Sequence, residues 1–183
     1  GFFGRASIAN FDGSGKGLSS LSSFYDPVDT DWSTGGCFKM KWISASTNMA
    51  MISAYTTSAF LMQRVNGPTI NIHDGSGGSI DTMDISGFKD DEWHHVAASY
   101  KSTGSGGPLW SIYIDGHKVA TSTSANVAWD GEFSIGSFPN AVNPMIGQAQ
   151  DFFFVNGDAL TASEINAIYS RRFTNNPQMM AGH

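Results

Sequence analysis

Hydrophobic and polar residues alternate along much of the chain with a period of two. The clearest example runs from Cys37 to Ile43, where apolar side chains at 38, 40 and 42 are separated by Lys39 and Lys41. Side chains along a β-strand point alternately to opposite faces, so this spacing predicts a strand with one buried face. The segments 93–100 and 110–115 alternate in the same way. The pattern therefore predicts a protein built mainly from half-buried strands.

The strongest local signal is the dipeptide Asp115-Gly116, which separates the predicted strand 110–115 from the segment 117–120. Asp-Gly tolerates positive φ at both central positions of a type I′ turn, the turn that best closes a two-residue hairpin. We therefore predict a β-hairpin here. Further strands are expected at Met49 to Tyr55, Ala59 to Val65, Thr69 to His73, Ser79 to Ile85, Glu132 to Ile135 and Gly147 to Val155.

One segment near the end of the chain lacks the alternation with a period of two and has the pattern of a helix start. Thr161 and Glu164 have the spacing of a capping box, in which each side chain accepts a hydrogen bond from a free backbone amide at the start of a helix. Leu160 and Ile165 flank this box and can pack together. A short helix is therefore expected to follow. The side chains expected to face the strands are Ile165, Ile168 and Tyr169.

Several of these segments occur in an order that is typical of a known family. Trp93-His94-His95-Val96-Ala97 is followed by Tyr113-Ile114-Asp115-Gly116, an opening Phe11-Asp12-Gly13-Ser14 precedes the strand Phe38 through Ile43, and the predicted helix begins within 159–165. In this order the chain resembles the laminin-G-like jelly rolls of the concanavalin-A-like lectin and glucanase superfamily, from about residue 6 to about residue 172. The resemblance implies an all-β, two-sheet antiparallel jelly-roll sandwich with one short C-terminal helix.

Length and composition agree with one domain. The 183 residues and an apolar share of 40% are enough for one sizeable core, and we find no internal repeat. We expect a single domain over residues 1–183, with a core of about 6–172 and a tail at 173–183. The chain begins at Gly1 with no initiator Met, which is typical of a processed or excised product or of an incompletely reported chain.

Charge and cysteine content exclude some classes of partner. The net charge is −6 and the ten Lys and Arg residues form no extended basic cluster, which argues against nucleic-acid binding. No apolar stretch is long enough to span a bilayer, so membrane insertion is not expected. Cys37 is the single cysteine, so an intrachain disulfide is impossible. Its position beside Phe38 predicts a buried apolar filler rather than a reactive thiol.

Residue patterns for catalysis are missing from the sequence. Glucanases of this superfamily carry Glu-x-Asp-x-x-Glu on one strand, because retaining hydrolysis needs two carboxyl groups about 5 Å apart. The chain has only the isolated Glu92, Glu132 and Glu164, and it has no Gly-x-Ser-x-Gly elbow. His94 and His95 are adjacent on a strand, so they should point to opposite faces and cannot bind one zinc ion. We therefore predict that the protein is not an enzyme.

Calcium is the one cofactor that the resemblance suggests, because laminin-G-like domains often hold this ion at a loop rim. The candidate carboxylates are Asp29 with Asp31, or Asp74 with Asp81 and Asp84. Neither group has a recognisable ligand spacing, and Asp is common in turns for its local hydrogen bonds. Family members also commonly carry Ile-Asp-Glu before the final strand, whereas here 149–151 reads Ala-Gln-Asp. We therefore predict no bound cofactor, with Asp29 and Asp31 as the calcium candidates.

Glycan binding needs exposed aromatic faces beside Asn, Asp or Gln side chains that satisfy sugar hydroxyls. Several residues in apparent loops have this chemistry, although each aromatic could instead fold over the core. The candidate ligand-binding residues are Trp32, Asp74, Trp129, Asp130, Asn140 and Asn143.

The family resemblance, together with the missing catalytic patterns, implies a non-catalytic recognition module, lectin-like, that binds a surface glycan or glycoprotein through loops at one edge of the sandwich. The expected location is extracellular, on a cell or particle surface, secreted or virion-associated. The alternative is a structural role, in which the same jelly roll decorates or attaches a larger assembly such as a phage capsid or tail and binds its protein subunits instead of a glycan.

Overall fold

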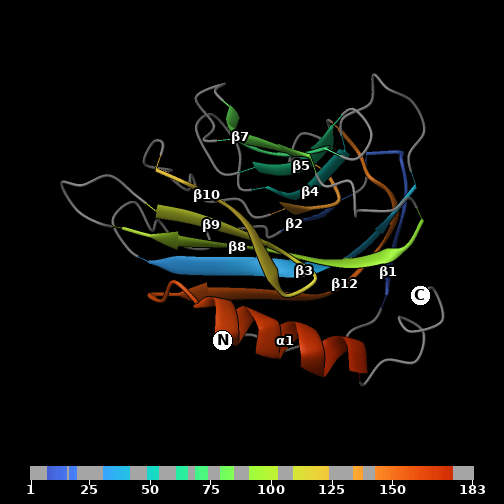
Figure 1. Cartoon of the computed structure of the whole chain (residues 1–183). Coiled ribbons are helices and arrows are strands. Elements are labelled where there is room, and N and C mark those ends of the chain that lie inside the picture. Colours follow the sequence, from blue (N-terminus) through green and yellow to red (C-terminus); the bar gives the residue numbers. More distant parts are fainter. Residues whose placement is uncertain are drawn as a thin grey trace.

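The fold was analysed in a computed structural model of the whole chain. It describes residues 8–15, 17–19, 31–41, 49–53, 61–65, 69–73, 79–84, 91–102, 109–123, 134–137 and 143–174, with backbone alone at 19, 61–65, 69–73, 79–84 and 172–174. These residues form twelve strands and one helix (Figure 1). Within them, no helix is long and apolar enough to cross a membrane.

The strands form two six-stranded sheets in which every neighbouring pair is antiparallel. Sheet A contains, in spatial order, β1 (Ala9–Asp12), β12 (Ile146–Asn156), β3 (Trp32–Met40), β8 (Trp93–Lys101), β9 (Leu109–Ile114) and β10 (His117–Ser122). Sheet B contains β2 (Leu18–Ser19), β11 (Ser134–Ile135), β4 (Met49–Ser53), β5 (Leu61–Val65), β6 (Thr69–His73) and β7 (Ser79–Asp84). The predicted two-sheet antiparallel sandwich with one C-terminal helix is confirmed.

The main core lies between the two sheets. Sheet B contributes Met49, Met51, Ile52 and Ile135 to it, and sheet A contributes the inward-facing residues of its central strands. Trp32, Tyr100 and Trp110 meet there, with ring centroids 4.9–5.5 Å apart. Burial of each large apolar side chain stabilises the fold by roughly 1.5–3 kcal/mol. The period of two therefore identified the inward side chains correctly.

The other face of sheet A is covered by the helix α1 (Ala162–Thr174), which lies on the side away from sheet B (Figure 1). Ile165 of α1 is fully buried and packs with Ala97, Tyr113 and Phe153 of the sheet. Leu160 and Ile168 pack against the same cluster. The prediction of half-buried strands is therefore wrong for β3 and β8, because α1 covers the face that was expected to meet solvent.

The capping box predicted at the start of α1 is confirmed. The backbone N–H of Thr161 donates to Glu164 Oε2 at 2.8 Å, and the N–H of Glu164 donates to Thr161 Oγ1 at 3.4 Å. The Thr161 hydroxyl also donates to Glu164 Oε2 at 2.7 Å. The hydrogen bonds from Thr161, first from its side chain and then from its backbone, lower the pKa of Glu164.

Strand limits agree with the sequence patterns except near Trp32. β6 has the predicted limits. β8 is one residue longer at its end, β9 begins and ends one residue earlier, and β12 is one residue longer at both ends. β3 begins at Trp32, before the predicted start at Cys37, and ends at Met40. The short strands β1 and β2 were not predicted. The predicted ends at 42–43, 54–55, 59–60, 85 and 132–133 lie outside the described residues.

A glycine pair in β3 lets β12 approach closely. A Cβ at Gly35 would lie 2.7 Å from the ring of Phe153, and one at Gly36 would lie 2.6 Å from the ring of Phe152. The two phenylalanines follow a register shift in β12, where Asp151 adopts a φ of 56°. The bulge brings Gln150 and Phe153, which are three residues apart, to the same face of sheet A, and Phe152 points to the other face. Glycines leave room for the two rings.

Candidate functional site

The strand register defines two ends of the sandwich. At the first, the hairpin end, the turn between β9 and β10 lies near the starts of β8 and β12 and the end of β3. At the second, the open end, β3 begins, β8 and β12 finish, and β9 begins. The Ala50 N–H donates to the Asn143 carbonyl oxygen at 2.9 Å, which places the start of β4 at the hairpin end. β4 therefore runs towards the open end.

The turn at the hairpin end is the one that the sequence predicts. Asp115 and Gly116 have φ values of 48° and 76°, so both central residues adopt the positive φ that a type I′ turn requires. The hairpin of β9 and β10 is therefore confirmed.

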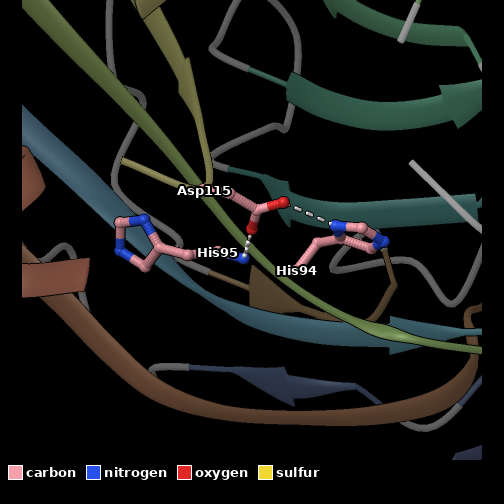
Figure 2. A network of polar contacts seen from close by, with 3 residues as sticks. All are labelled: His94, His95 and Asp115. Atoms are coloured by element: carbon pink, nitrogen blue, oxygen red, sulfur yellow. Dashed lines mark hydrogen bonds and ion pairs between the residues drawn. The ribbon is translucent and has the colours of Figure 1, made fainter. Parts of the chain in front are cut away.

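Three residues at this end form a polar network (Figure 2). The backbone N–H of Asp115 donates to the His95 carbonyl oxygen, and the His95 N–H donates to Asp115 Oδ1, each at 2.8 Å. Asp115 Oδ2 lies 2.8 Å from His94 Nδ1. Val96 and Ile114 form the preceding rung of the β8–β9 ladder. The Asp115 carboxylate thus takes the place of a backbone carbonyl where the chain turns away into the hairpin.

Figure 2 also shows the two imidazoles leaving β8 in opposite directions. His94 is 3% exposed and pairs with Asp115, whereas the His95 ring packs on the helix side against Phe153 and Tyr169. The prediction that the two rings cannot meet at one ion is confirmed. Sequence reasoning did not foresee that Asp115 joins the two motifs, although an acid at the turn and a histidine at the strand start were visible signals.

Trp32 was predicted to present an exposed ring to a ligand, and this prediction is wrong. Its side chain is fully buried between Tyr100 and Trp110. Trp32 shares its even position with Phe38 and Met40, so it points into the core from the same face of β3. The small residues at 33–36 hid this continuity in the sequence.

Asp31 immediately precedes Trp32 at the open end. Its Oδ1 accepts the Ser102 N–H at 2.8 Å, and its carbonyl oxygen accepts the Gly157 N–H at 2.8 Å. These bonds join the start of β3 to the ends of β8 and β12. Among the described residues no group of three or more His, Cys, Asp or Glu could hold a metal ion. Calcium at Asp31 with Asp29 stays a prediction, because Asp29 lies outside the described residues.

Of the remaining predicted residues, Asn143 is the one whose side chain the structure describes. Asn143 is partly buried at the hairpin end, with a φ of 52° and its carbonyl bonded to β4. Asp81 and Asp84 belong to β7, where only the backbone is described. The other predicted residues, Asp74, Trp129, Asp130 and Asn140, lie outside the described residues.

The chain carries a match to a known family. A laminin-G-type model described as the "Concanavalin A-like lectin/glucanases superfamily" matches residues 28–166. The chain belongs to this superfamily. The match runs from just before β3 into α1 and includes both motifs that meet at Asp115. No curated protein sequence matches the chain.

Solved structures share the fold at low sequence identity. The receptor binding domain of botulinum neurotoxin D is 15% identical with a TM-score of 0.67, over 94% of this chain and 49% of that chain. The binding domain of botulinum neurotoxin DC, in complex with rat synaptotagmin II, is 13% identical with a TM-score of 0.57, over 91% of this chain and 46% of that chain. Trypanosoma rangeli sialidase is 12% identical with a TM-score of 0.63, over 91% of this chain and 29% of that chain. This chain spans half or less of each, so the likeness is one of fold.

Proposed function

We propose that the protein is a non-catalytic recognition module, located outside the cell or on a cell or particle surface, that binds a carbohydrate through the loops at the open end of the sandwich. Membership of a superfamily that includes lectins supports a carbohydrate ligand. The strand register supports the choice of end, and it is the observation on which the proposal depends.

Three chain segments with suitable chemistry adjoin strand ends on this side. β3 starts here directly after Asp31. β6 finishes at His73, immediately before Asp74, and its last residue pairs with the start of β5, which pairs with the end of β4. β11 starts at Ser134, shortly after Trp129-Asp130, and it too pairs with the end of β4. A tryptophan face can pack on a sugar ring, and nearby carboxylates can accept hydrogen bonds from its hydroxyl groups.

The hairpin end is a poorer candidate for a ligand. Asp115 already accepts two hydrogen bonds there, and the backbone of Asn143 joins β4. Polar groups that are committed to internal hydrogen bonds are costly to redirect to a ligand. The open end is therefore the proposed binding site, and the hairpin end supplies positions for control variants in the same molecule.

A glycan array probed with the wild-type chain and two variants tests the proposal. Trp129→Ala should abolish binding or weaken it at least tenfold, because stacking on the sugar is lost. Lys118→Ala changes an exposed residue of β10 just after the turn at the hairpin end, and should bind like the wild type. Equal loss in both variants, or wild-type binding by Trp129→Ala, would contradict a site at the open end.

The proposal of a non-catalytic role rests on the missing Glu-x-Asp-x-x-Glu run. Incubation of the chain with β-glucan and with sialylated oligosaccharide should release no reducing sugar and no sialic acid. Steady release that increases with protein concentration would show that the module is an enzyme.

A protein partner is the second candidate, because one structure with this fold is a binding domain in complex with rat synaptotagmin II. Stable incorporation of the chain into a symmetric particle, together with no response to any glycan on the array, would favour this structural or attachment role over carbohydrate recognition.

A further inference from the structure

The connection between β12 and α1 carries a reactive pair of residues at the open end of the sandwich. β12 ends at Asn156, whose register partner is Trp32 at the start of β3, and Gly157 follows it. Both Asn156 and Gly157 are exposed. A Cβ added at Gly157 would meet no atom within 4 Å, so this side of the connection faces open space. Water therefore reaches both residues of the pair.

An asparagine that precedes a glycine can lose its side-chain amide without an enzyme. The backbone nitrogen of the glycine attacks Cγ of the asparagine, and the two residues close a five-membered imide ring. Glycine favours this step because it has no Cβ to collide with the asparagine side chain and because its backbone adopts unusual angles at little cost. Asn156 and Gly157, which has a φ of 83°, therefore have both the sequence and the space for ring closure.

One hydrogen bond restrains the attacking nitrogen. The Gly157 N–H donates to the Asp31 carbonyl oxygen at 2.8 Å. While the proton is held in this bond, the nitrogen is turned towards β3 and not towards Cγ of Asn156. Ring closure therefore requires the bond to open. Hydrogen bonds at exposed ends of strands open at a smaller free-energy cost than those in the core of a sheet.

Ser33 holds the chain on the other side of Gly157. Its hydroxyl donates to the Asp158 carbonyl oxygen at 3.1 Å and accepts the Leu160 N–H at 2.8 Å. Ser33 is itself fully buried on β3, so its position is fixed. These two hydrogen bonds limit how far the connection can move, and hence how often the bond between Gly157 and Asp31 opens.

We propose that Asn156 is a deamidation site, gated by the hydrogen bond from Gly157 to Asp31 and by the Ser33 hydroxyl, and that its product loosens the start of α1. The reaction needs only water and atoms of the chain, so it is independent of carbohydrate binding. Its test measures mass, so failure of the proposed function and failure of this inference are separate results.

The reaction balances without an oxidant or a cofactor. Hydroxide takes the proton from the Gly157 nitrogen, and this nitrogen attacks Cγ of Asn156. A C–N bond forms, the bond from Cγ to the side-chain nitrogen breaks, and ammonia leaves after taking a proton from water. Water then opens the imide ring. Cleavage at Cγ gives aspartate, and cleavage at the backbone carbonyl gives isoaspartate.

Both products change the open end. A carboxylate replaces a neutral amide two residues before Asp158. Isoaspartate also adds a carbon atom to the backbone, which moves Gly157 out of line with the Asp31 carbonyl and removes the bond between them. Because α1 begins at Ala162, shortly after this connection, its first turn should then open more often.

The test follows the peptide that contains Asn156 by mass spectrometry while the whole folded chain is kept in mildly alkaline buffer. The other Asn-Gly pair, at 66–67, lies in a separate peptide and outside the described residues. Slow conversion of Asn156 to imide, aspartate and isoaspartate is expected. Ser33→Ala removes both bonds to the connection and should speed conversion about tenfold, the effect of losing one typical hydrogen bond.

Two variants serve as controls. Ser99→Ala changes the buried register partner of Ser33 on β8 and should react like the wild type, because no hydrogen bond of the described residues joins Ser99 to the connection. Asn156→Gln should react far more slowly, because its longer side chain must close a larger ring. Wild-type protein rich in isoaspartate should show faster hydrogen exchange in the first turn of α1, and unchanged exchange there would contradict the loosening.

Unfolding also speeds deamidation, so local opening is measured separately. In Ser33→Ala the Gly157 amide should exchange hydrogen faster while the amides of β8 exchange as in the wild type. If both accelerate, the variant is unfolded, and the native wild type compared with the chain in guanidinium decides alone. Equal rates in the two would show that no gate exists. No conversion in the native chain, at times when the guanidinium sample has reacted fully, would overturn the site.

Discussion

The two faces of sheet A are both buried, but they are built differently. The inner face meets sheet B through large aromatic and aliphatic side chains that form one continuous cluster. The outer face meets a single helix, and its apolar contacts divide into two smaller clusters, with Gln150 and His95 buried beside them. A sheet-on-sheet contact thus provides most of the apolar burial. The helix covers a face of sheet A that contains both apolar and polar side chains.

The largest effect should follow from truncation on the inner face. Trp32→Ala removes a fully buried ring that contacts both Tyr100 and Trp110, and should lower the free energy of unfolding by about 3–5 kcal/mol. Denaturant unfolding measures this loss. Leu109→Ala, at a partly exposed position of the same sheet, is the matched control and should cost less than about 1 kcal/mol.

A smaller loss is expected on the outer face. Ile165→Ala removes a fully buried side chain of α1 and should cost about 2 kcal/mol, at the low end for such a change, because a single helix can shift to fill part of the space. Hydrogen exchange should show faster exchange in α1 with little change in β3. Equal acceleration in both elements would mean that helix and sandwich unfold as one unit. Ala167→Ser, at an exposed position of α1, provides the baseline.

The smallest effect concerns alkaline pH. The pKa of Tyr169 is raised in the folded state, chiefly by burial, so the neutral phenol is favoured there. Its contribution to stability is fully present below the unfolded value near 10 and is lost as pH rises through the higher folded value. Thermal unfolding from pH 8 to 11 should show a steeper decline for the wild type than for Tyr169→Phe, by less than about 1 kcal/mol after solvent screening. Parallel declines would show that the phenol is not shielded.

Local signals in the sequence were sufficient to predict the hairpin turn, the helix cap and the inward residues of β3. Asp115-Gly116 adopts the positive φ that a type I′ turn requires and forms the predicted turn. Thr161 and Glu164 form the predicted helix cap. Alternation also identified the inward residues of β3, since Phe38 and Met40 are both fully buried. Each of these features depends on neighbours within a few residues, which is the range over which a sequence pattern carries information.

Features that depend on distant segments were missed. Trp32 carries the chemistry of a ligand-stacking ring, and only the arrival of β8 and β9 beside it shows that it belongs to the core. The burial of the His95 ring on the second face depends on Tyr169 of α1, which is more than 60 residues further along the chain. Of the predicted binding residues, Trp32, Asp31 and Asn143 could be placed, and each has a structural contact that spacing alone does not reveal.

The bulge in β12 connects the two faces mechanically. Phe152 and Phe153 are consecutive, yet one packs towards Phe38 in the main core and the other stacks on His95 beneath α1. An added Cβ at Gly35 or Gly36 would lie less than 3 Å from one of these rings, so both rings pack closely over the backbone of β3. A change in the packing of α1 on Phe153 would therefore shift Phe152 as well, and a disturbance that begins under the helix would reach the hydrophobic interior.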